Sequence, residues 1–532
     1  MKPVRSGASG ARTAAALVLM AMASLSAAHA QGAGPVVRIA QGELRGATKP
    51  GVETFKGIPF AKPPVGSLRW RAPEPAGSWS GVRDATVASP ACVQSGELAF
   101  ARKQSEDCLY LNVWRPAGVK AGAKLPVMVW IHGGGFVRGT GSAPQYDGSH
   151  VARRGVIQVT INYRLGRLGF FAHPALTAEN PGGPLGNYGL LDQIAGLKWV
   201  KANIAAFGGD AAKVTIFGES AGGMAVNDLM VSPLARGLFS KAIAQSSGGR
   251  MPPLPIRGAA KLTAEGIGLS VATRLGVTGE GQEALNALRA LPPEKFTVDS
   301  GRSFNGEIRS VPAAPMIDGV VLAESPIAAF EGGREAKVPY IIGANSFEAS
   351  LVPEATENPE AVLARTGARE KIVAVYGGDP KRASQNFTTE TMMVEPARNL
   401  ARLHARNGQP TWFYHFSFVP PAWRAMYPGL PHAGEIPYVF NTIQDYETTI
   451  EYGRAPPATP EDLPIAQSAI SYWTAFAKTA NPGKAGGPQW PRYNPAAEEL
   501  LEFGMGGPKV VRDFHKASLD LVEQLSTATG DK

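Results

Sequence analysis

The sequence predicts an α/β fold in which a mostly parallel sheet is covered by helices on both faces. Near-continuous apolar runs indicate buried strands at residues 125–131, 156–161, 214–217 and 338–342. Strands that are apolar on both sides belong to sheets whose two faces are both covered. Helical stretches lie between these strands, for example at residues 190–205 and 221–230. An alternation of strands and helices along a chain is typical of α/β proteins.

The chain on either side of this alternation has a different composition. Residues 36–70 combine short apolar stretches with glycine and proline, which predicts a small meander of strands. Residues 454–464 and 481–495 are rich in proline and glycine, and we expect them to be surface connections around a helix at 465–479. No internal repeat or shift in composition marks a boundary, so the sequence predicts one domain over residues 31–532.

Residues 1–30 have the composition of a secretory signal peptide. The first twelve residues contain three basic side chains and no acidic one, and an apolar run over 14–28 ends at the small-x-small triplet Ala28-His29-Ala30. This run is shorter than the roughly 20 residues that span a bilayer, and no other run in the sequence is long enough. We therefore predict export to the periplasm or secretion, with no integral membrane segment after removal of the signal; an uncleaved anchor is the alternative.

The overall charge gives little support to nucleic-acid binding. The formal net charge is +9, and removal of residues 1–30 lowers it by three. The basic residues are scattered, without a Lys/Arg run interleaved with aromatic residues. With 44% hydrophobic and 18% charged residues, the chain is predicted to bury a large core.

Cys92 and Cys108 are the only cysteines in the chain. An isolated pair in an exported protein predicts one disulfide, with two free thiols as the alternative. No histidine lies near either cysteine, so we expect no metal site and no metal cofactor.

A serine flanked by glycines follows one of the predicted strands. Residues 214–217 lead into Gly218-Glu219-Ser220-Ala221-Gly222, and a predicted helix begins immediately afterwards. Gly-x-Ser-x-Gly between a strand and a helix is the pattern of a nucleophile elbow, a tight turn that needs small neighbours and exposes the serine hydroxyl. The helix N-terminus would also direct backbone amides and the positive end of its dipole at the site. The pattern occurs once in the sequence and predicts Ser220 as a nucleophile.

A glycine-rich stretch follows the predicted strand at 125–131. It reads His132-Gly133-Gly134-Gly135. During acyl transfer negative charge develops on the carbonyl oxygen of the substrate, and fixed backbone N–H groups stabilise this charge. Glycines have no side chain, so they let the backbone approach the substrate closely. An HGGG stretch upstream of Gly-x-Ser-x-Gly therefore predicts an oxyanion hole, and the two motifs together are more specific than either alone.

A serine nucleophile needs a histidine that accepts its proton, and after such an elbow the acid and the histidine follow the serine along the chain. The histidines beyond Ser220 are His404, His415, His432 and His515. We expect His404 and His515 in helices and His415 in an apolar strand, positions typical of structural histidines. His432 is expected in a loop after a strand, where sheets of this kind carry catalytic groups, and is the predicted base.

The partner acid is expected at the end of a core strand. Glu348 follows the predicted strand at 338–342 after a short connection. Asp318, in Ile317-Asp318-Gly319, has the surroundings of a turn residue. Position favours Glu348, with Asp318 as the alternative.

Together these motifs resemble the type-B carboxylesterases, the family that includes bacterial p-nitrobenzyl esterases, animal carboxylesterases and cholinesterases. The resemblance covers roughly residues 35–520. Further stretches that carry it are FKGIPFAKPPVG at 55–66, SEDCLYLN at 105–112, GNYGLLDQ at 186–193 and YWTAFAK at 472–478.

The resemblance implies an α/β-hydrolase fold with large insertions that shape an active-site gorge, and a serine ester hydrolase that forms an acyl-enzyme without a cofactor. It implies a catalytic triad of Ser220, Glu348 and His432. The implied oxyanion hole consists of the Gly134, Gly135 and Ala221 amides. It also implies a Cys92–Cys108 disulfide, the ion pairs Arg69–Glu106 and Arg164–Asp192, and support of the acid by Ser246.

Two departures from the family pattern bear on the site. Cholinesterases carry a choline-binding tryptophan inside the cysteine loop, whereas residues 93–107 contain none, so we do not expect a quaternary-ammonium substrate. Phe347 and Ala349 flank Glu348 where the family commonly has aspartate and glycine. The expected partner is a small-molecule ester, and the sequence makes no prediction of its identity or of the oligomeric state.

Two other functions would fit the same fold. Some family members have lost the serine and act as surface receptors, but Ser220, Glu348 and His432 are all retained here. An amidase or a thioesterase would use the same triad, and the sequence leaves that choice open.

Overall fold

The computed structural model describes residue 1 and residues 34–96, 103–248, 250, 252–298, 313–445, 449–450, 453–454 and 458–530 of the 532-residue chain. The predicted signal peptide, apart from Met1, lies outside the described residues. Among the residues that are described, no helix has both the length and the apolar character that a membrane crossing requires.

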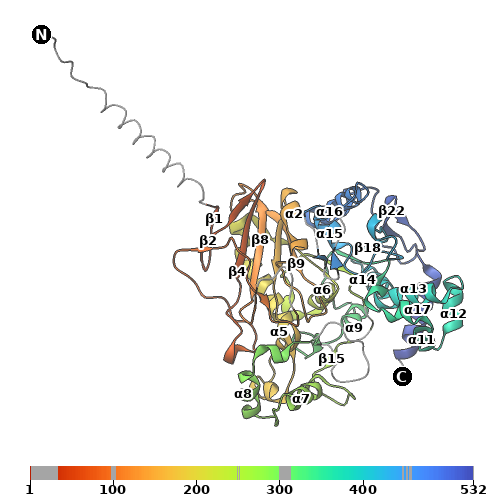
Figure 1. Cartoon of the computed structure of the whole chain (residues 1–532), viewed down its shortest axis with the longest axis horizontal. Helices are drawn as coiled ribbons and strands as arrows, with labels where there is room; N and C mark the ends of the chain where they lie inside the picture. The colour runs from red at the N-terminus through yellow and green to blue at the C-terminus, as the bar shows by residue number, and fades with distance from the viewer. Residues whose placement is uncertain are drawn as a thin grey trace.

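An 11-stranded sheet runs through the described chain (Figure 1). The strands from β21 to β10 are parallel neighbours, and antiparallel strands complete both ends. In spatial order they are β22 (Gly507–Val511), β21 (Leu500–Gly504), β18 (Thr411–Phe416), β17 (Tyr340–Asn345), β14 (Lys241–Gln245), β13 (Gly209–Glu219), β9 (Leu125–Ile131), β10 (Ile157–Ile161), β8 (Tyr110–Pro116), β4 (Val52–Pro59) and β3 (Ala47–Lys49).

Both faces of the sheet are buried, as the apolar runs predict. Successive side chains of a strand point to opposite faces. In β9, Val127 and Val129 belong to one hydrophobic cluster, whereas Met128 and Trp130 belong to another. Helices α5 (Tyr188–Asn203), α6 (Ala221–Val231) and α14 (Glu395–Arg406) contribute to the first cluster, and α15 (Ile436–Phe440) and α16 (Asp462–Thr479) to the second. The prediction of a sheet covered on both faces is confirmed.

Most predicted elements agree with the structure to within a few residues. The predicted strand at 125–131 coincides with β9, and the predicted helix at 221–230 is α6. Strand β17 begins two residues later than predicted, because Pro339 has no N–H to donate to a neighbouring strand. His515 was predicted inside the last helix, which is wrong: its φ of 50° does not fit a right-handed helix, and α17 (Lys516–Gly530) begins at the next residue.

The N-terminal strands divide between two sheets rather than forming one meander. Strand β1 (Val36–Ile39) pairs with β2 (Gly42–Arg45), which pairs with β5 (Val82–Asp84). Strand β4 joins the large sheet instead, because its Phe55 and Ile58 are completely buried in the core.

Long segments leave the sheet after β14 and after β17. The first contains α7 (Ala264–Arg274), α8 (Gln282–Ala290) and α9 (Pro326–Glu331), and the second contains α11 (Pro359–Ala364), α12 (Arg369–Val375) and α13 (Pro380–Thr389) before α14. Figure 1 shows both groups of helices at the periphery of the sheet. They are the insertions that the family resemblance implies.

The disulfide and the two ion pairs that the family resemblance implies are present in the structure. Cys92 and Cys108 form a disulfide, and both are buried. The Arg69 guanidinium donates to both carboxylate oxygens of Glu106, each at 2.7 Å. A second guanidinium–carboxylate pair, Arg164 with Asp192, is buried and also uses two donors.

Removal of the disulfide should destabilise the protein. We expect Cys92→Ser/Cys108→Ser to lower the free energy of unfolding by about 3 kcal/mol, because the bond closes a loop of about 15 residues in the unfolded chain. Urea denaturation with and without a reductant measures the loss, and the double variant is the control because reductant should not affect it. Two titratable thiols in the unreduced, unfolded protein would contradict the bond.

Candidate active site

Ser220 occupies a strained turn between β13 and α6. Its φ of 56° and ψ of −125° lie outside the regions that L-residues ordinarily adopt. The Ser220 N–H donates to the carbonyl of Gln245 at 2.9 Å, and its own carbonyl accepts from the Met224 N–H at 2.8 Å. Strain of this kind persists only where the surroundings impose it, and here the turn is held both by β14 and by its own helix.

The glycines around Ser220 are required by close packing against β9. A Cβ on Gly222 would lie 2.0 Å from the carbonyl oxygen of Ile131. A Cβ on Gly218 would lie 2.5 Å from the Gly222 backbone. Both distances are far below van der Waals contact, so any other residue would force the elbow away from the sheet.

The glycine-rich loop after β9 passes directly beside Ser220. A Cβ on Gly133 would lie 3.1 Å from the Ser220 Cβ. The loop is fixed from the sheet, because the Tyr163 hydroxyl donates to the His132 carbonyl at 2.8 Å and the two rings stack. Gly134 has a φ of 98°, which strongly favours glycine.

The predicted oxyanion donors have unused N–H groups. In the described part of the chain, the backbone N–H groups of Gly134 and Gly135 donate no hydrogen bond. Ala221 is the first residue of α6, where N–H groups have no acceptor within the helix. Unengaged donors therefore lie in the loop whose Gly133 passes beside Ser220, and Ala221 opens the helix that directly follows Ser220.

Glu348 and His432 are brought together in the core. Glu348 Oε2 lies 2.5 Å from His432 Nδ1. The other carboxylate oxygen accepts from the Ser246 hydroxyl at 2.6 Å and from the Asn345 N–H at 2.7 Å. Both Glu348 and His432 are buried, and the His432 N–H donates to Ser350 Oγ. Three segments that follow β14, β17 and β18 thus meet at one carboxylate.

Asp318 has a different role. Its Oδ1 accepts hydrogen bonds from the N–H groups of Val320, Val321 and Leu322, and its Oδ2 accepts from the Leu185 N–H. These bonds stabilise a turn, which agrees with the turn-like sequence around Asp318. Of the two candidate acids, it is Glu348 whose carboxylate reaches His432.

The residues beside Glu348 fit their surroundings despite the departure from the family pattern. Phe347 and Ala349 are buried and pack on Ala355. The Phe347 N–H donates to the Leu430 carbonyl at 2.9 Å, and the Ala349 N–H to Thr389 Oγ1 at 3.1 Å. The first of these bonds ties the loop of the acid to the loop of the histidine.

Two further buried carboxyl groups surround His432. Glu219 Oε1 lies 3.1 Å from His432 Nε2, an ion-pair distance without hydrogen-bond geometry. Glu435 accepts from Gln245 Nε2 at 2.9 Å and from Asn345 Nδ2 at 2.6 Å. The sequence analysis missed both, although Glu219 directly precedes Ser220 in the elbow.

These carboxylates determine the charge of His432. Burial alone lowers the pKa of His432, but Glu219 first and Glu348 next outweigh it and raise the pKa to about 10. Burial raises the pKa of Glu435, the third carboxyl group of the cluster. The resting site therefore favours a protonated imidazole.

The remaining histidines after Ser220 have structural surroundings. His404 is buried between Glu335 Oε1 and the Val338 carbonyl. His415 is buried in β18, and burial lowers its pKa to about 3. His515 pairs with Glu390 at 2.8 Å. Among the residues that the structure describes, no group of three or more His, Cys, Asp or Glu side chains is arranged to hold a metal ion.

Comparison with known proteins agrees with this geometry. The model of the carboxylesterase family matches residues 33–521. The chain belongs to this family.

The relatives of this carboxylesterase include bacterial esterases. It is 36% identical over 473 residues to the fumonisin B1 esterase of Sphingopyxis macrogoltabida, covering 85% of this chain and 83% of that protein. It is also 36% identical to the para-nitrobenzyl esterase of Bacillus subtilis (strain 168), over 88% of this chain and 94% of the relative. The crystal structure of a Geobacillus stearothermophilus carboxylesterase superimposes with a TM-score of 0.78 at 33% identity, over 91% of this chain and 99% of that one. The α/β-hydrolase fold is thereby confirmed.

The pKa of His432 can be tested directly. We expect its imidazole to titrate near pH 10, and Glu219→Gln to lower this pKa by at least about one unit, because an opposite charge is removed. NMR of ¹⁵N-histidine-labelled protein measures both values. Since the folded pKa lies above the unfolded value of about 6.5, the protonated imidazole adds stability that is complete below pH 6.5 and lost as pH rises through about 10.

A matched control removes a carboxylate from another histidine. Glu390→Gln alters the partner of His515 and should leave the titration of His432 unchanged. Titration of His432 near 6.5 in the unmodified protein, or no change in Glu219→Gln, would contradict the electrostatic account.

Proposed function

We propose that this carboxylesterase hydrolyses small-molecule carboxylic esters through an acyl-enzyme formed on Ser220. The observation that carries the proposal is the 2.5 Å contact between Glu348 Oε2 and His432 Nδ1 in a buried site next to the Ser220 elbow. A carboxylate on Nδ1 holds the tautomer whose Nε2 can accept a serine proton.

The reaction then follows from the roles of the three side chains. Ser220 Oγ attacks the ester carbonyl carbon while His432 Nε2 accepts its proton. The bond to the alcohol oxygen breaks, and His432 returns the proton to the departing alcohol. Water attacks the acyl-enzyme with His432 again as base, releasing the carboxylic acid and restoring the Ser220 hydroxyl. Glu348 stabilises the imidazolium that forms in each half.

The proposed oxyanion donors are the N–H groups of Gly134, Gly135 and Ala221. Negative charge develops on the carbonyl oxygen in both halves of the reaction, and fixed N–H groups stabilise it without reorganisation. The positive φ of Gly134 and Gly135 and the first-turn position of Ala221 support this assignment.

Glu219 is expected to influence the pH range of this reaction. Its carboxylate lies beside Nε2, the atom that accepts the proton. The raised pKa of His432 means that the base must lose a proton before attack, so activity should rise with pH above the ordinary histidine range. Catalytic hydrogen bonds commonly form only when substrate binds, and Nε2 is already next to the elbow.

We also propose that the mature enzyme acts outside the cytoplasm as one catalytic domain. The signal-like composition of residues 1–30 supports export, and the Cys92–Cys108 disulfide is of a kind that persists in oxidising compartments. Relatives named as esterases support a small-molecule ester as substrate.

Loss of the nucleophile should abolish turnover. Ser220→Ala is expected to lower kcat for 4-nitrophenyl acetate by about 10⁴-fold or more, because no other group can form the acyl-enzyme. Ser471→Ala is the control, since that hydroxyl lies on the exposed side of α16, bonds only to Gln467 of the same helix and should retain full activity. Full activity in Ser220→Ala would reject the proposal.

The acid can be distinguished from its sequence alternative. Glu348→Gln should keep the fold but lose several orders of magnitude in kcat, because an amide can present the wrong group to His432 Nδ1. Asp318→Asn should stay within about tenfold of the unmodified enzyme, because it alters only a turn. Steady-state kinetics of the two variants on one ester compare them. A severe Asp318→Asn and a mild Glu348→Gln would show that the acid is misassigned.

A further inference from the structure

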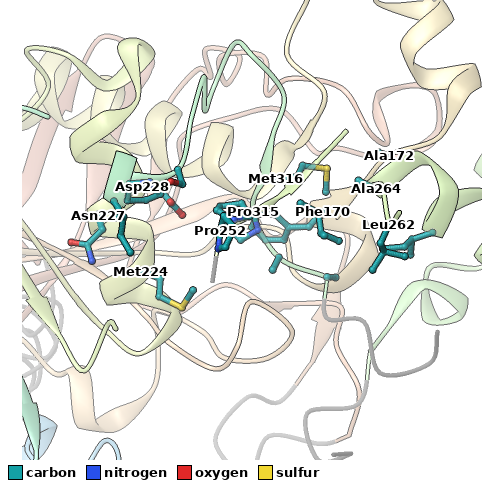
Figure 2. Close-up of a pocket in the computed structure, with 18 of the residues that line it drawn as sticks. Phe170, Ala172, Met224, Asn227, Asp228, Pro252, Leu262, Ala264, Pro315 and Met316 are labelled. Carbon is teal, nitrogen blue, oxygen red and sulfur yellow. The ribbon is translucent and has the colours of Figure 1, made fainter. Parts of the chain in front are cut away.

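A pocket of about 410 Å³ begins one helical turn beyond Ser220 (Figure 2). Ser220 itself does not line it; Met224 does, from the next turn of α6. Figure 2 shows Met224, Asn227 and Asp228 toward one end, Pro252, Pro315 and Met316 in the middle, and Leu262 and Ala264 toward the other end. Most of the lining side chains are apolar, so the pocket suits a hydrocarbon chain.

Among the described residues, Asp228 is the one acidic side chain in this lining. It is 4% exposed, and among the described residues burial is the only influence on its carboxyl, with no hydrogen-bond donor or charged partner. Its neighbour Asn227, by contrast, has partners, donating to Ser247 Oγ at 3.1 Å and accepting from the Tyr340 hydroxyl at 2.6 Å. Buried polar groups normally have partners, so a buried carboxyl without one at a pocket wall indicates a ligand group.

The position of the pocket indicates that it binds the acyl part of an ester rather than the alcohol part. The departing alcohol must lie next to His432, which protonates it. The pocket is lined from α3 (Gly166–Gly169), α6, α7, α9 and α14, and by residues 247, 248, 250, 252–254 and 313–316. None of the lining residues comes from the loop of His432. The acyl group, covalently held on Ser220, is therefore the part that can extend along α6.

We propose that Asp228 makes this pocket selective for acyl chains that end in a neutral hydrogen-bonding group, such as a hydroxyl. The inference rests on the proposed function, since it names the substrate class of the same site. Residues 220, 224 and 228 share one side of α6, and eight residues at 1.5 Å each separate Ser220 from Asp228 by about 12 Å. Acyl chains of medium length can span that distance.

The chemistry of the carboxyl explains the preference for a neutral group. Burial raises the pKa of Asp228 to about 8, so near neutral pH the group is a carboxylic acid that both donates and accepts. A hydroxyl can satisfy both functions. A plain alkyl end would displace water from the carboxyl and leave it unpaired, which disfavours binding by roughly tenfold.

The two arginines that line the pocket do not pair with the Asp228 carboxyl. Arg250 is paired with Glu395. Arg167 is half-buried and donates to the Thr297 carbonyl at 3.4 Å. Neither contributes to the pKa of Asp228, for which burial is the cause.

The kinetic test compares matched esters on the mature enzyme. Unmodified enzyme should show a higher kcat/KM for 4-nitrophenyl 8-hydroxyoctanoate than for 4-nitrophenyl octanoate. Asp228→Leu should reverse the order and change the ratio by tenfold or more, whereas Asp228→Asn, which still donates and accepts, should keep the original order. The acetate ester is too short to reach Asp228, so its kcat/KM in each of the three proteins is the reference to which the values for the longer esters are normalised. An unchanged ratio in Asp228→Leu, with acetate still hydrolysed through Ser220, would overturn the inference and leave the proposed function standing.

A binding test is independent of hydrolysis. Calorimetry on Ser220→Ala should find tighter binding of 1,8-octanediol than of 1-octanol, and Asp228→Leu in the same background should reverse this order. Equal affinities in both proteins would overturn the inference even if no ester were hydrolysed.

Thermal unfolding checks that Asp228 is a buried acid and that the variants fold. The raised pKa means that ionisation of Asp228 disfavours the folded state as pH rises from about 4 to about 8. Asp228→Asn should therefore raise Tm relative to the unmodified enzyme at pH 8.5 and not at pH 4. An equal change in Tm at both pH values would contradict a buried carboxylic acid at this position.

Discussion

The contact between the Ser220 turn and the end of β9 is the constraint on which the rest of the site depends. Gly222 lies so close to the carbonyl of Ile131 that no Cβ can be accommodated there. This approach forces the chain to turn sharply from β13 into α6 and places Ser220 in an unfavourable backbone conformation, at a cost of roughly 1–3 kcal/mol. The same approach sets the HGGG loop, which follows β9, beside the serine. One steric contact thus positions both Ser220, the proposed nucleophile, and the loop that carries the proposed oxyanion donors.

A second constraint is electrostatic and acts on His432. Glu219, Glu348 and Glu435 are all buried within one hydrogen-bonded region, and burying carboxylates is costly unless they have partners. Ser246, Asn345 and Gln245 supply donors to Glu348 and Glu435, and the imidazole faces Glu219 and Glu348. The arrangement stabilises an imidazolium, the charge that a histidine base acquires in acyl transfer. It also disfavours the neutral imidazole, so the pH range over which His432 loses its proton is a consequence of this cluster.

The sequence predicted those features that depend on local pattern. Strand β9 and the start of α6 follow from an unbroken apolar run and from a glycine-flanked serine, and both agree with the structure. Glu348 was favoured because it directly follows a core strand, and Asp318 proved to be a turn residue. Residues whose surroundings depend on which strands are neighbours in the sheet could not be predicted from the nearby sequence. Glu435 and Asp228 are ordinary helix-flanking or helical acids in sequence, and only the adjacency of β14, β17 and β18 and the fold of the inserted helices show what surrounds them.

Formation of an acyl-enzyme on Ser220 is the central claim, and rapid-quench mass spectrometry tests it most directly. The enzyme is mixed with excess 4-nitrophenyl acetate, quenched in acid within the first turnover, and measured intact and after proteolysis. The account predicts a single acetyl group per chain, located on the peptide that contains Ser220, and none in Ser220→Ala. Acetylation of a different residue, or steady turnover with no acetylated protein in either form, would contradict it.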